Sequence, residues 1–306
     1  MQASITGLTD GQEYGVRIFP RGKLGFQTAE QGAVAVATPG QVYPVYEYTG
    51  QHELIIDDES KGDWRIKFLT SGVFVMHHPQ ELAIDVFLVG GGGSGANNTQ
   101  IDGVNYMPKG GNGGRTKTIF RKILANQEYD IVIGAGGEGV TGNSITGGND
   151  GGTTSAFGDS AAGGMRGIPT NPSGINGGSG GGGVISGSSP KAAGGSDGGD
   201  GTGGATLETK GGTGQGTTTR EFGEPFGALY SSGGGGSTDN TNTMSPGGAG
   251  SGGDSGKNSV NPEEYNGKPG KFYGDGGGGS AIGYYAHSGS GHQGIAIIRN
   301  HREATA

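Results

Sequence analysis

Side chains able to do chemistry are few in this sequence and stand far apart. His77 and His78 end an apolar run, where the two-residue alternation of a strand would point them to opposite faces. His287 and His292 lie among glycines and serines, and residues 57–59 form an acidic turn. None of these groups has the ligand spacing of a zinc site or of a calcium-binding loop, so we expect no metal site.

Catalytic and cofactor motifs are equally weak. GxGxxG patterns occur often, but a chain with 75 glycines in 306 residues produces them by chance. A dinucleotide site also needs a helix after the glycines, and no amphipathic helix is visible. The sequence has no GxxxxGK[ST] phosphate loop, and no nucleophile, base and acid stand in a recognisable arrangement. We therefore predict a protein that is not an enzyme and that has no cofactor.

Aromatic side chains that interrupt the glycine-rich part are the best candidates for a binding site. They add contact area at a small entropy cost, and loops on a rigid scaffold are common places for recognition. The alternative is a structural role, in which the same rings pack inside the protein. The predicted receptor-binding residues are Tyr106, Phe226, Tyr230, Tyr284 and Tyr285.

Charge and hydropathy argue against several classes of partner. The formal net charge is −8 and no basic cluster is visible, so we expect no nucleic-acid binding. No apolar run reaches about 18 residues, so we expect no membrane insertion. The chain has no cysteine, and its start, MQASITGLTDGQEY, does not resemble a signal peptide. An extracellular role would then need another exit route, such as cell lysis.

Two unlike kinds of sequence must position these candidates. Of the 75 glycines, 65 lie between residues 90 and 294. Short runs rich in β-branched and aromatic residues stand before, within and after this region, bounded by turn residues, and they predict strands. The runs are 14–20, 34–38, 53–56, 64–69, 72–77, 82–89, 115–123, 128–134 and 294–300. A strand framework that opens before the glycines and closes after them indicates an ordered insertion rather than a linker.

The spacing of the glycines is the second indication of order. Three runs place glycine at every third position: Gly174, Gly177, Gly180 and Gly183; Gly195, Gly198, Gly201 and Gly204; and Gly247, Gly250, Gly253 and Gly256. Three residues per turn is the period of the polyproline-II helix, whose backbone groups point outward and need partners. The motif GGGGS also recurs, at 90–94, 233–237 and 276–280, which indicates equivalent turning or packing points. The sequence therefore predicts a mostly β fold plus polyglycine-II, in which a β-strand framework encloses a bundle of short glycine-rich helices.

Several motifs carry a resemblance to a known family. IDVFLVGGGGSGANN, KGGNGGRTKT, NQEYDIVIGAGGEG and GIAIIRN resemble the glycine-rich domain of bacteriophage tail fibre and minor tail proteins, over about residues 45–300. Such domains are similar to the polyglycine-II sandwiches of tail-tip adhesins of T-even-like phages. They are also similar to the glycine-rich domain of the anaplastic lymphoma kinase ectodomain.

The first 39 residues resemble the C-terminal half of a fibronectin type III domain. The stretch ITGLTDGQEYGVRIFPRGKLGFQT followed by VAVATP fits the last strands of that sandwich, with Leu8 and Tyr14 placed like its tyrosine corner. The predicted domains are therefore 1–39, a strand framework at 40–89, and a glycine-rich domain at 90–300. That domain carries strands at 115–134 and 294–300, and a tail follows at 301–306.

The resemblance implies a function in attachment. We expect a module of a virion tail that binds a bacterial surface receptor, protein or glycan, and that contacts other tail or fibre proteins. The resemblance also allows a homotrimer through the fibre. The main alternative is a spacer or decoration domain of a tail fibre, with receptor binding done elsewhere. A polysaccharide-degrading enzyme is disfavoured because carboxylates do not cluster, and an ice-binding protein is disfavoured because no regular threonine array is present.

Overall fold

A computed structural model describes residues 14–18, 33–37, 44–59, 61–77, 81–97, 99–101, 104–106, 108–142, 147–168, 179–182, 198–201, 211–213, 219–237, 243–281 and 286–302. The longer strands are β1 (Tyr14–Ile18), β2 (Ala33–Ala37), β4 (His52–Asp58), β5 (Asp63–Phe68), β6 (Gly72–Met76), β7 (Leu82–Val89), β10 (Thr116–Ile123), β11 (Glu128–Ile131) and β14 (Ile295–Asn300). Five strands have three residues each: β3 (Tyr46–Tyr48), β8 (Thr99–Ile101), β9 (Val104–Tyr106), β12 (Thr154–Ala156) and β13 (Asp159–Ala161). Within these described ranges the 3-10 helices are η3 (Glu221–Gly223), η4 (Gly248–Gly250) and η5 (Pro262–Tyr265).

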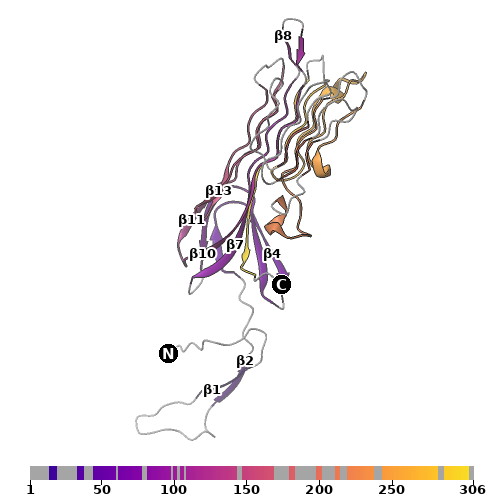
Figure 1. The fold of residues 1–306 in the computed structure, drawn as a ribbon. Coiled ribbons are helices and arrows are strands. Elements are labelled where there is room, and N and C mark those ends of the chain that lie inside the picture. The colour runs from indigo at the N-terminus through magenta and orange to yellow at the C-terminus, as the bar shows by residue number, and fades with distance from the viewer. Residues whose placement is uncertain are drawn as a thin grey trace, which may run out of the picture.

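The prediction of a mostly β chain is confirmed, and Figure 1 shows the arrangement. All nine predicted strand runs coincide with the longer strands. The five three-residue strands were not predicted, because three residues carry too little alternation to be recognised in sequence.

A β-sandwich forms one end of the glycine-rich unit. Its sheets have the strand orders β10-β7-β14-β5-β4 and β11-β6-β3, and every pair is antiparallel. Their inner faces share one core, which includes Ile66, Phe74, Ile84, Ile131 and Ile298. The hairpin of β12 and β13 adds Phe157 and two alanines to this core. Hydrophobic burial therefore stabilises the sandwich in the ordinary way.

Two central strands are buried on both faces. β7 and β14 show almost no exposed position, whereas β5 alternates strictly between buried and half-buried. The second core lies on the outer face, where Phe87 and Ile297 contact Phe222 and Tyr230 from a later segment. This double burial explains why IAII is wholly apolar and why LAIDVFLV is apolar except for Asp85.

Extended glycine-rich segments, which we call rods, form the rest of the unit. Eight of them among the described residues are neither strand nor helix: 90–97, 108–115, 133–140, 147–153, 162–168, 231–237, 275–281 and 288–294. Rod 90–97 continues from β7, rod 162–168 follows β13, and rods 108–115 and 288–294 lead into β10 and β14. Figure 1 shows the chain running from the sandwich into this layered bundle and back.

The backbone hydrogen bonds of the rods repeat every three residues. Rod 90–97 donates to three neighbours in rotation. The neighbour 108–115 receives Gly90 N–H at Arg115, Gly93 N–H at Asn112 and Ala96 N–H at Lys109. The neighbour 147–153 receives Gly91 at Gly152 and Ser94 at Asn149, and the neighbour 288–294 receives Gly92 at His292 and Gly95 at Gly289. These N–H···O distances are 2.7–3.0 Å, so the rods satisfy their backbones by bonding to one another.

The sheet sets the register of the rods. In β7 and β10, Val89 pairs with Thr116, and the next residue, Gly90, bonds to Arg115. The same register then continues through Asn112 and Lys109, at every third residue rather than every one. β7 and β14 continue in the same way into rods 90–97 and 288–294. Strand pairing therefore decides which glycine of each rod faces which neighbour.

The three GGGGS copies are the innermost rods. Residues 90–97, 231–237 and 274–281 are buried at every position. Rod 275–281 links the other two, because Gly277 N–H donates to Gly93 and Gly279 N–H donates to Gly235. The recurring motif therefore marks equivalent packing points and not turns. At these positions a rod is surrounded on all sides, and every residue except Asn97 and Asp275 is glycine, serine or alanine.

Outer rods show the three-residue period in their burial. Along 131–139 the pattern is buried, exposed, half-buried, three times over. The buried line holds Gly134 and Gly137, while the exposed line holds Val132, Ala135 and Glu138. Within rod 133–140, the buried positions are therefore glycine, while Ala135 and Glu138 lie on the line that faces solvent.

One predicted glycine run is not a continuous rod. Gly248 to Gly250 form η4, and Ser251 N–H and Gly252 N–H both return to Gly248 O. The chain reverses there, so that Ser255 N–H donates to Ser245 O at 2.9 Å across the turn. The prediction that Gly247, Gly250, Gly253 and Gly256 belong to a polyproline-II-like run is therefore wrong at Gly248–Gly250. Of the other predicted positions, Gly180, Gly198 and Gly201 are described, and Gly174, Gly177, Gly183, Gly195 and Gly204 lie outside the described residues.

Candidate functional site

Tyr230 is a core residue, and its prediction as an exposed receptor contact was wrong. Its side chain is 1% exposed and packs edge-on against Phe87 of β7 at 5.2 Å between ring centroids. Its hydroxyl donates to Glu221 Oε2 at 2.7 Å. The cause is the doubly buried sheet, whose outer apolar face needs a cover that the sandwich itself does not supply.

Phe226 is fully exposed, at 100%, but it lies beside the sheet. Phe226 sits in a turn in which Gly227 N–H donates to Glu224 O at 3.0 Å. The two ends of the surrounding segment form a β-bridge between Arg220 and Leu229. The adjacent helix η3 contacts β7. Phe226 is therefore exposed as predicted, but away from the far end of the bundle.

The far end of the bundle, which we call the distal pole, gathers the ends of several rods. Asn97 Nδ2 donates to Gly142 O there, Ser280 N–H donates to Ala96 O, and Ala281 N–H donates to Tyr265 O. Hairpin β8–β9, which contains Tyr106, projects beyond it (Figure 1). Tyr284 and Tyr285 lie outside the described residues, between Ala281 and His287. The structure thus separates Tyr106 from Phe226 and Tyr230.

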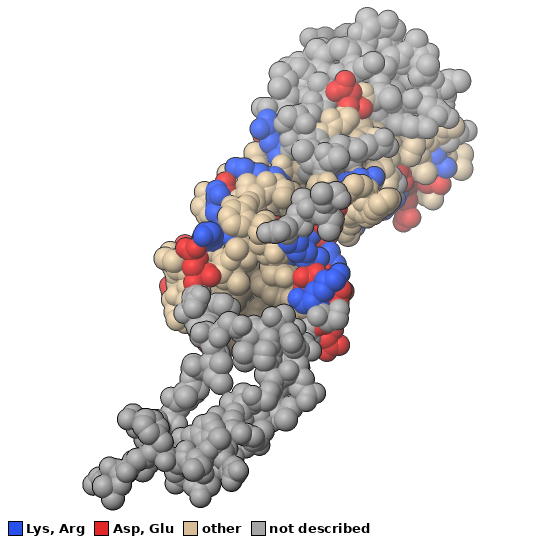
Figure 2. Space-filling model, turned by 60° about the horizontal axis from the view of Figure 1, so that its bottom comes forward, with Lys and Arg blue, Asp and Glu red and all other residues tan. Residues whose placement is uncertain are grey.

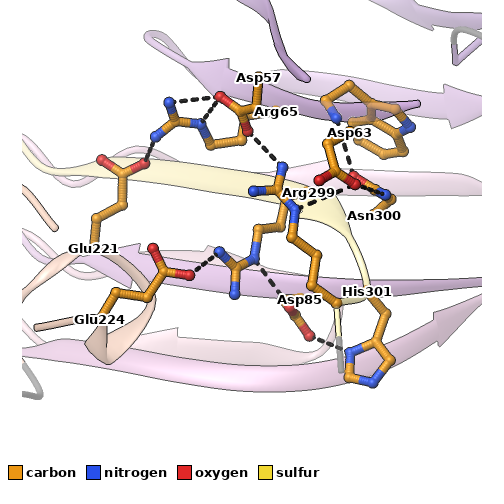
Figure 3. Close-up of polar contacts among 11 residues, drawn as sticks. Asp57, Asp63, Arg65, Asp85, Glu221, Glu224, Arg299, Asn300 and His301 are labelled. Carbon is orange, nitrogen blue, oxygen red and sulfur yellow. Dashed lines mark hydrogen bonds and ion pairs between the residues drawn. The ribbon is translucent and has the colours of Figure 1, made fainter. Parts of the chain in front are cut away.

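A polar network covers the outer face of the five-stranded sheet (Figure 3). Arg65 of β5 and Arg299 of β14 are direct cross-strand neighbours, and Asp85 of β7 follows on the same row. Two like charges side by side destabilise a sheet. Glu221 and Glu224 of the covering segment compensate, because Glu221 pairs with Arg65 and Glu224 pairs with Arg299 at 2.5 Å.

Further contacts complete the network. Asp57 bonds Arg65 at 2.7 Å and Arg302 at 2.5 Å, so it bridges two cations. Arg299 Nε lies 3.0 Å from Asp85 Oδ2, and His301 Nδ1 lies 2.6 Å from the other oxygen of that carboxylate. The Arg299 guanidinium also stacks on the ring of Phe222, 4.1 Å from its centroid.

This arrangement fastens the segment 219–230 to the sheet. Each carboxylate in it faces a guanidinium, whereas a general acid or base needs a carboxyl free to exchange its proton with substrate. On the face shown in Figure 2, basic and acidic side chains likewise lie next to one another, and neither kind forms a large continuous patch among the coloured residues. Sequence reasoning missed this network. The only signals for it in the sequence were Arg65 and Arg299, which alternate with apolar residues in their strands, and two glutamates three residues apart at 221 and 224.

Asp275 is a buried polar residue outside this network, at the place where the rods meet the outer core. Asp275 is fully buried and accepts hydrogen bonds from Ser232 N–H at 2.9 Å and Phe272 N–H at 2.8 Å. Burial raises the pKa of Asp275 to about 6, although these N–H donors act in the opposite direction. Asp275 therefore ties the central rod 275–281 to rod 231–237 at the cost of a buried charge.

The raised pKa of Asp275 predicts a pH effect on stability. The unfolded chain ionises this residue near a pKa of about 3.9, and the folded chain near about 6. Between these values the folded state binds more protons, so the free energy of unfolding falls as pH rises, by about 3 kcal/mol in all. Urea unfolding at pH 4, 5, 6 and 7 measures this change in the free energy of unfolding.

The Asp275→Asn variant is the control for this effect, because other carboxylates titrate in the same range. Subtracting the variant's pH profile from that of the wild type isolates Asp275. A difference that does not change between pH 4 and pH 6.5 would show that Asp275 does not carry the effect.

Metal and membrane features are limited in the part of the chain that the structure describes. No three His, Asp or Glu side chains among these residues come together as metal ligands. His287 contacts Thr141 Oγ1 at 2.8 Å, and His292 packs against the ring of Tyr273. Across the same described stretches, no helix has the length and apolar character to cross a membrane.

Comparison with known protein families covers most of the chain. A family model described as a glycine-rich domain matches residues 69–301. The match begins after β5 and includes β6, β7, β10, the rods and β14. No match was found among curated proteins.

Proposed function

Because the chain belongs to the glycine-rich domain family, we propose that it is a module of a phage or phage-like tail. In this proposal it attaches the particle to a receptor on the bacterial surface. The rods are the rigid scaffold, and the distal pole carries the contacts. The module works on the virion tail, outside the infected cell, and its other partners are tail or fibre proteins.

We propose further that the rods are polyglycine-II helices. Support comes from the three-residue rotation of hydrogen-bond partners and from the three-residue burial pattern of 131–139. Both features fit three residues per turn, which is the period of polyproline-II geometry and not of a strand. The N-cap residue Gly247, with φ −66° and ψ 161°, lies in the same region of backbone conformation.

The position of the chain ends carries the functional proposal. The glycine-rich unit is entered through β3 and left after β14, and both strands belong to the sandwich. A fibre connected through residues 1–43 therefore joins at the sandwich, and the distal pole is the free end. We propose that residues 1–39 are the C-terminal half of a fibronectin type III domain in that fibre.

A spacer or decoration domain is the second candidate function. The hydrogen-bonded rods favour it as well, because a lattice fastened on all sides resists bending regardless of what its free end contacts. Receptor binding by the isolated module separates the two functions.

The test uses the purified, fluorescently labelled chain and a panel of bacterial strains. We expect saturable binding to at least one strain. Tyr106→Ala, Tyr284→Ala or Tyr285→Ala should weaken it by about 2 kcal/mol where the ring is an anchor, which is roughly 30-fold in affinity. Phe226→Ala is the matched control, because its ring is exposed but lies beside the sheet.

Melting curves accompany each variant to exclude loss of folding. Binding to no strain in the panel would favour the spacer. Equal loss of binding in Phe226→Ala and the distal-pole variants would contradict a contact surface at the distal pole.

A further inference from the structure

One loop of the distal pole is held in a fixed shape. Residues 257–266 close on themselves, because Lys257 N–H donates to Glu264 O at 2.8 Å and the two side chains form an ion pair at 3.2 Å. Tyr265 Oη donates to Ser259 O, and Asn261 Oδ1 accepts from Glu263 N–H at the start of η5. Four contacts within ten residues leave the loop little freedom to lose on binding.

The loop is fixed to the end of a central rod. Ala281 N–H donates to Tyr265 O at 2.8 Å, and Gly256 N–H donates to Gly279 O at 2.8 Å. Rod 275–281 runs away from the sandwich in the same direction as rod 90–97, since Gly277 and Ser280 donate to Gly93 and Ala96. The loop therefore lies beyond the last residues of that rod, at the free end of the unit.

The loop presents an apolar side chain to solvent. Val260 is 102% exposed. Met244 is 45% exposed and lies in the extended segment that bonds to 251–256 through Ser245. Glu263, three residues after Val260 in the same loop, is exposed as well. An exposed apolar side chain and an exposed carboxylate on one rigid loop have the composition of a small protein-recognition surface.

We propose that loop 257–266 contacts the receptor, and that the receptor epitope is a protein surface with an apolar patch beside a lysine or arginine. Val260 and Met244 supply the apolar contact, and Glu263 pairs with the cation. The net charge of −8 and the carboxylates of the loop would repel a phosphate-bearing or acidic polysaccharide. This inference rests on the proposed attachment function and names its partner.

The experiment measures binding of the labelled full chain to the strain found in the panel. We expect Val260→Ser and Glu263→Lys each to weaken binding at least about tenfold, and Glu263→Gln to weaken it less and to reduce its salt dependence. Phe226→Ser is the matched control and should change affinity less than about twofold. Cells treated with protease should lose binding, whereas cells treated with periodate should keep it.

The outcomes separate the two proposals. Absence of wild-type binding to every strain overturns the attachment function together with this inference. Wild-type binding that Val260→Ser and Glu263→Lys leave intact, with unchanged melting temperatures, overturns the assignment of the loop alone. Loss of binding after periodate but not after protease identifies a glycan and overturns the protein epitope.

Discussion

Gly92→Ala is expected to prevent the chain from folding to its native state. A Cβ at Gly92 would lie 1.9 Å from Asp275 O and 2.3 Å from Asp275 C, both backbone atoms of another central rod. The two rods would have to separate by more than about 1 Å, which would break the bonds that join them, from Gly277 N–H to Gly93 O and from Ser280 N–H to Ala96 O. We expect a loss of about 4 kcal/mol or more, a large part of the stability of a typical domain.

Urea unfolding and yield of soluble protein measure the effect of Gly92→Ala. Two variants in extended segments serve as controls. Gly199→Ala meets its nearest atom, Thr213 O, at 3.0 Å and should cost only about 1 kcal/mol. Ala135→Val adds two methyl groups on the solvent line and should change stability by less than about 0.5 kcal/mol. Similar stability of all three variants would contradict a bundle held by close backbone approach.

Arg299→Met is expected to cost about 3 kcal/mol at pH 7. The variant leaves Asp85, only 8% exposed, with His301 as its remaining partner, and it takes Arg299 from Glu224 as well. Breaking a buried ion pair from one side costs about 3–5 kcal/mol. Relief of repulsion between the cross-strand cations Arg65 and Arg299 returns less than about 1 kcal/mol. Loss of the buried pair therefore decides the sign.

Lys61→Met is the matched control for Arg299→Met. Lys61 pairs with Asp58 at 3.2 Å, but its side chain is 72% exposed, so the change should stay within about 0.5 kcal/mol. Adding Asp85→Leu to Arg299→Met should recover part of the loss, because no unpaired buried charge then remains. If Arg299→Met unfolds at the same urea concentration as Lys61→Met, the network does not fasten the segment 219–230.

Strands were predictable from the sequence because each one carries its own evidence. Runs such as WRIKFL and GIAIIRN combine β-branched residues with turn residues at their ends, and β5 and β14 lie there. The run 82–89 is apolar except for Asp85, a pattern typical of a strand buried on both faces, but it was predicted only as a strand. The cover of its second face by Phe222 and Tyr230 was therefore not predicted.

The neighbours of each rod were not predictable in the same way. A glycine carries no side chain to distinguish one partner from another, so Gly91 and Gly92 are chemically alike although they bond to different rods. The choice of partner depends on strand pairing many residues away, in β7, β10 and β14. Spacing in threes alone could not separate a continuous rod from the reversal at η4.

Because strand pairing sets the register of the rods, it limits the insertions and deletions that the glycine-rich chain can accept. One residue added to or lost from rod 90–97 would turn everything beyond it by a third of a revolution, and each later glycine would face the wrong neighbour. A change of three residues restores the facing, provided that adjoining rods grow by a similar amount. Insertions and deletions should therefore be tolerated in multiples of three residues within the bundle, and in any number at the distal loops. They should hardly be tolerated at the junctions Val89–Gly90 and Gly294–Ile295, where the two-residue repeat of the strand meets the three-residue repeat of the rod.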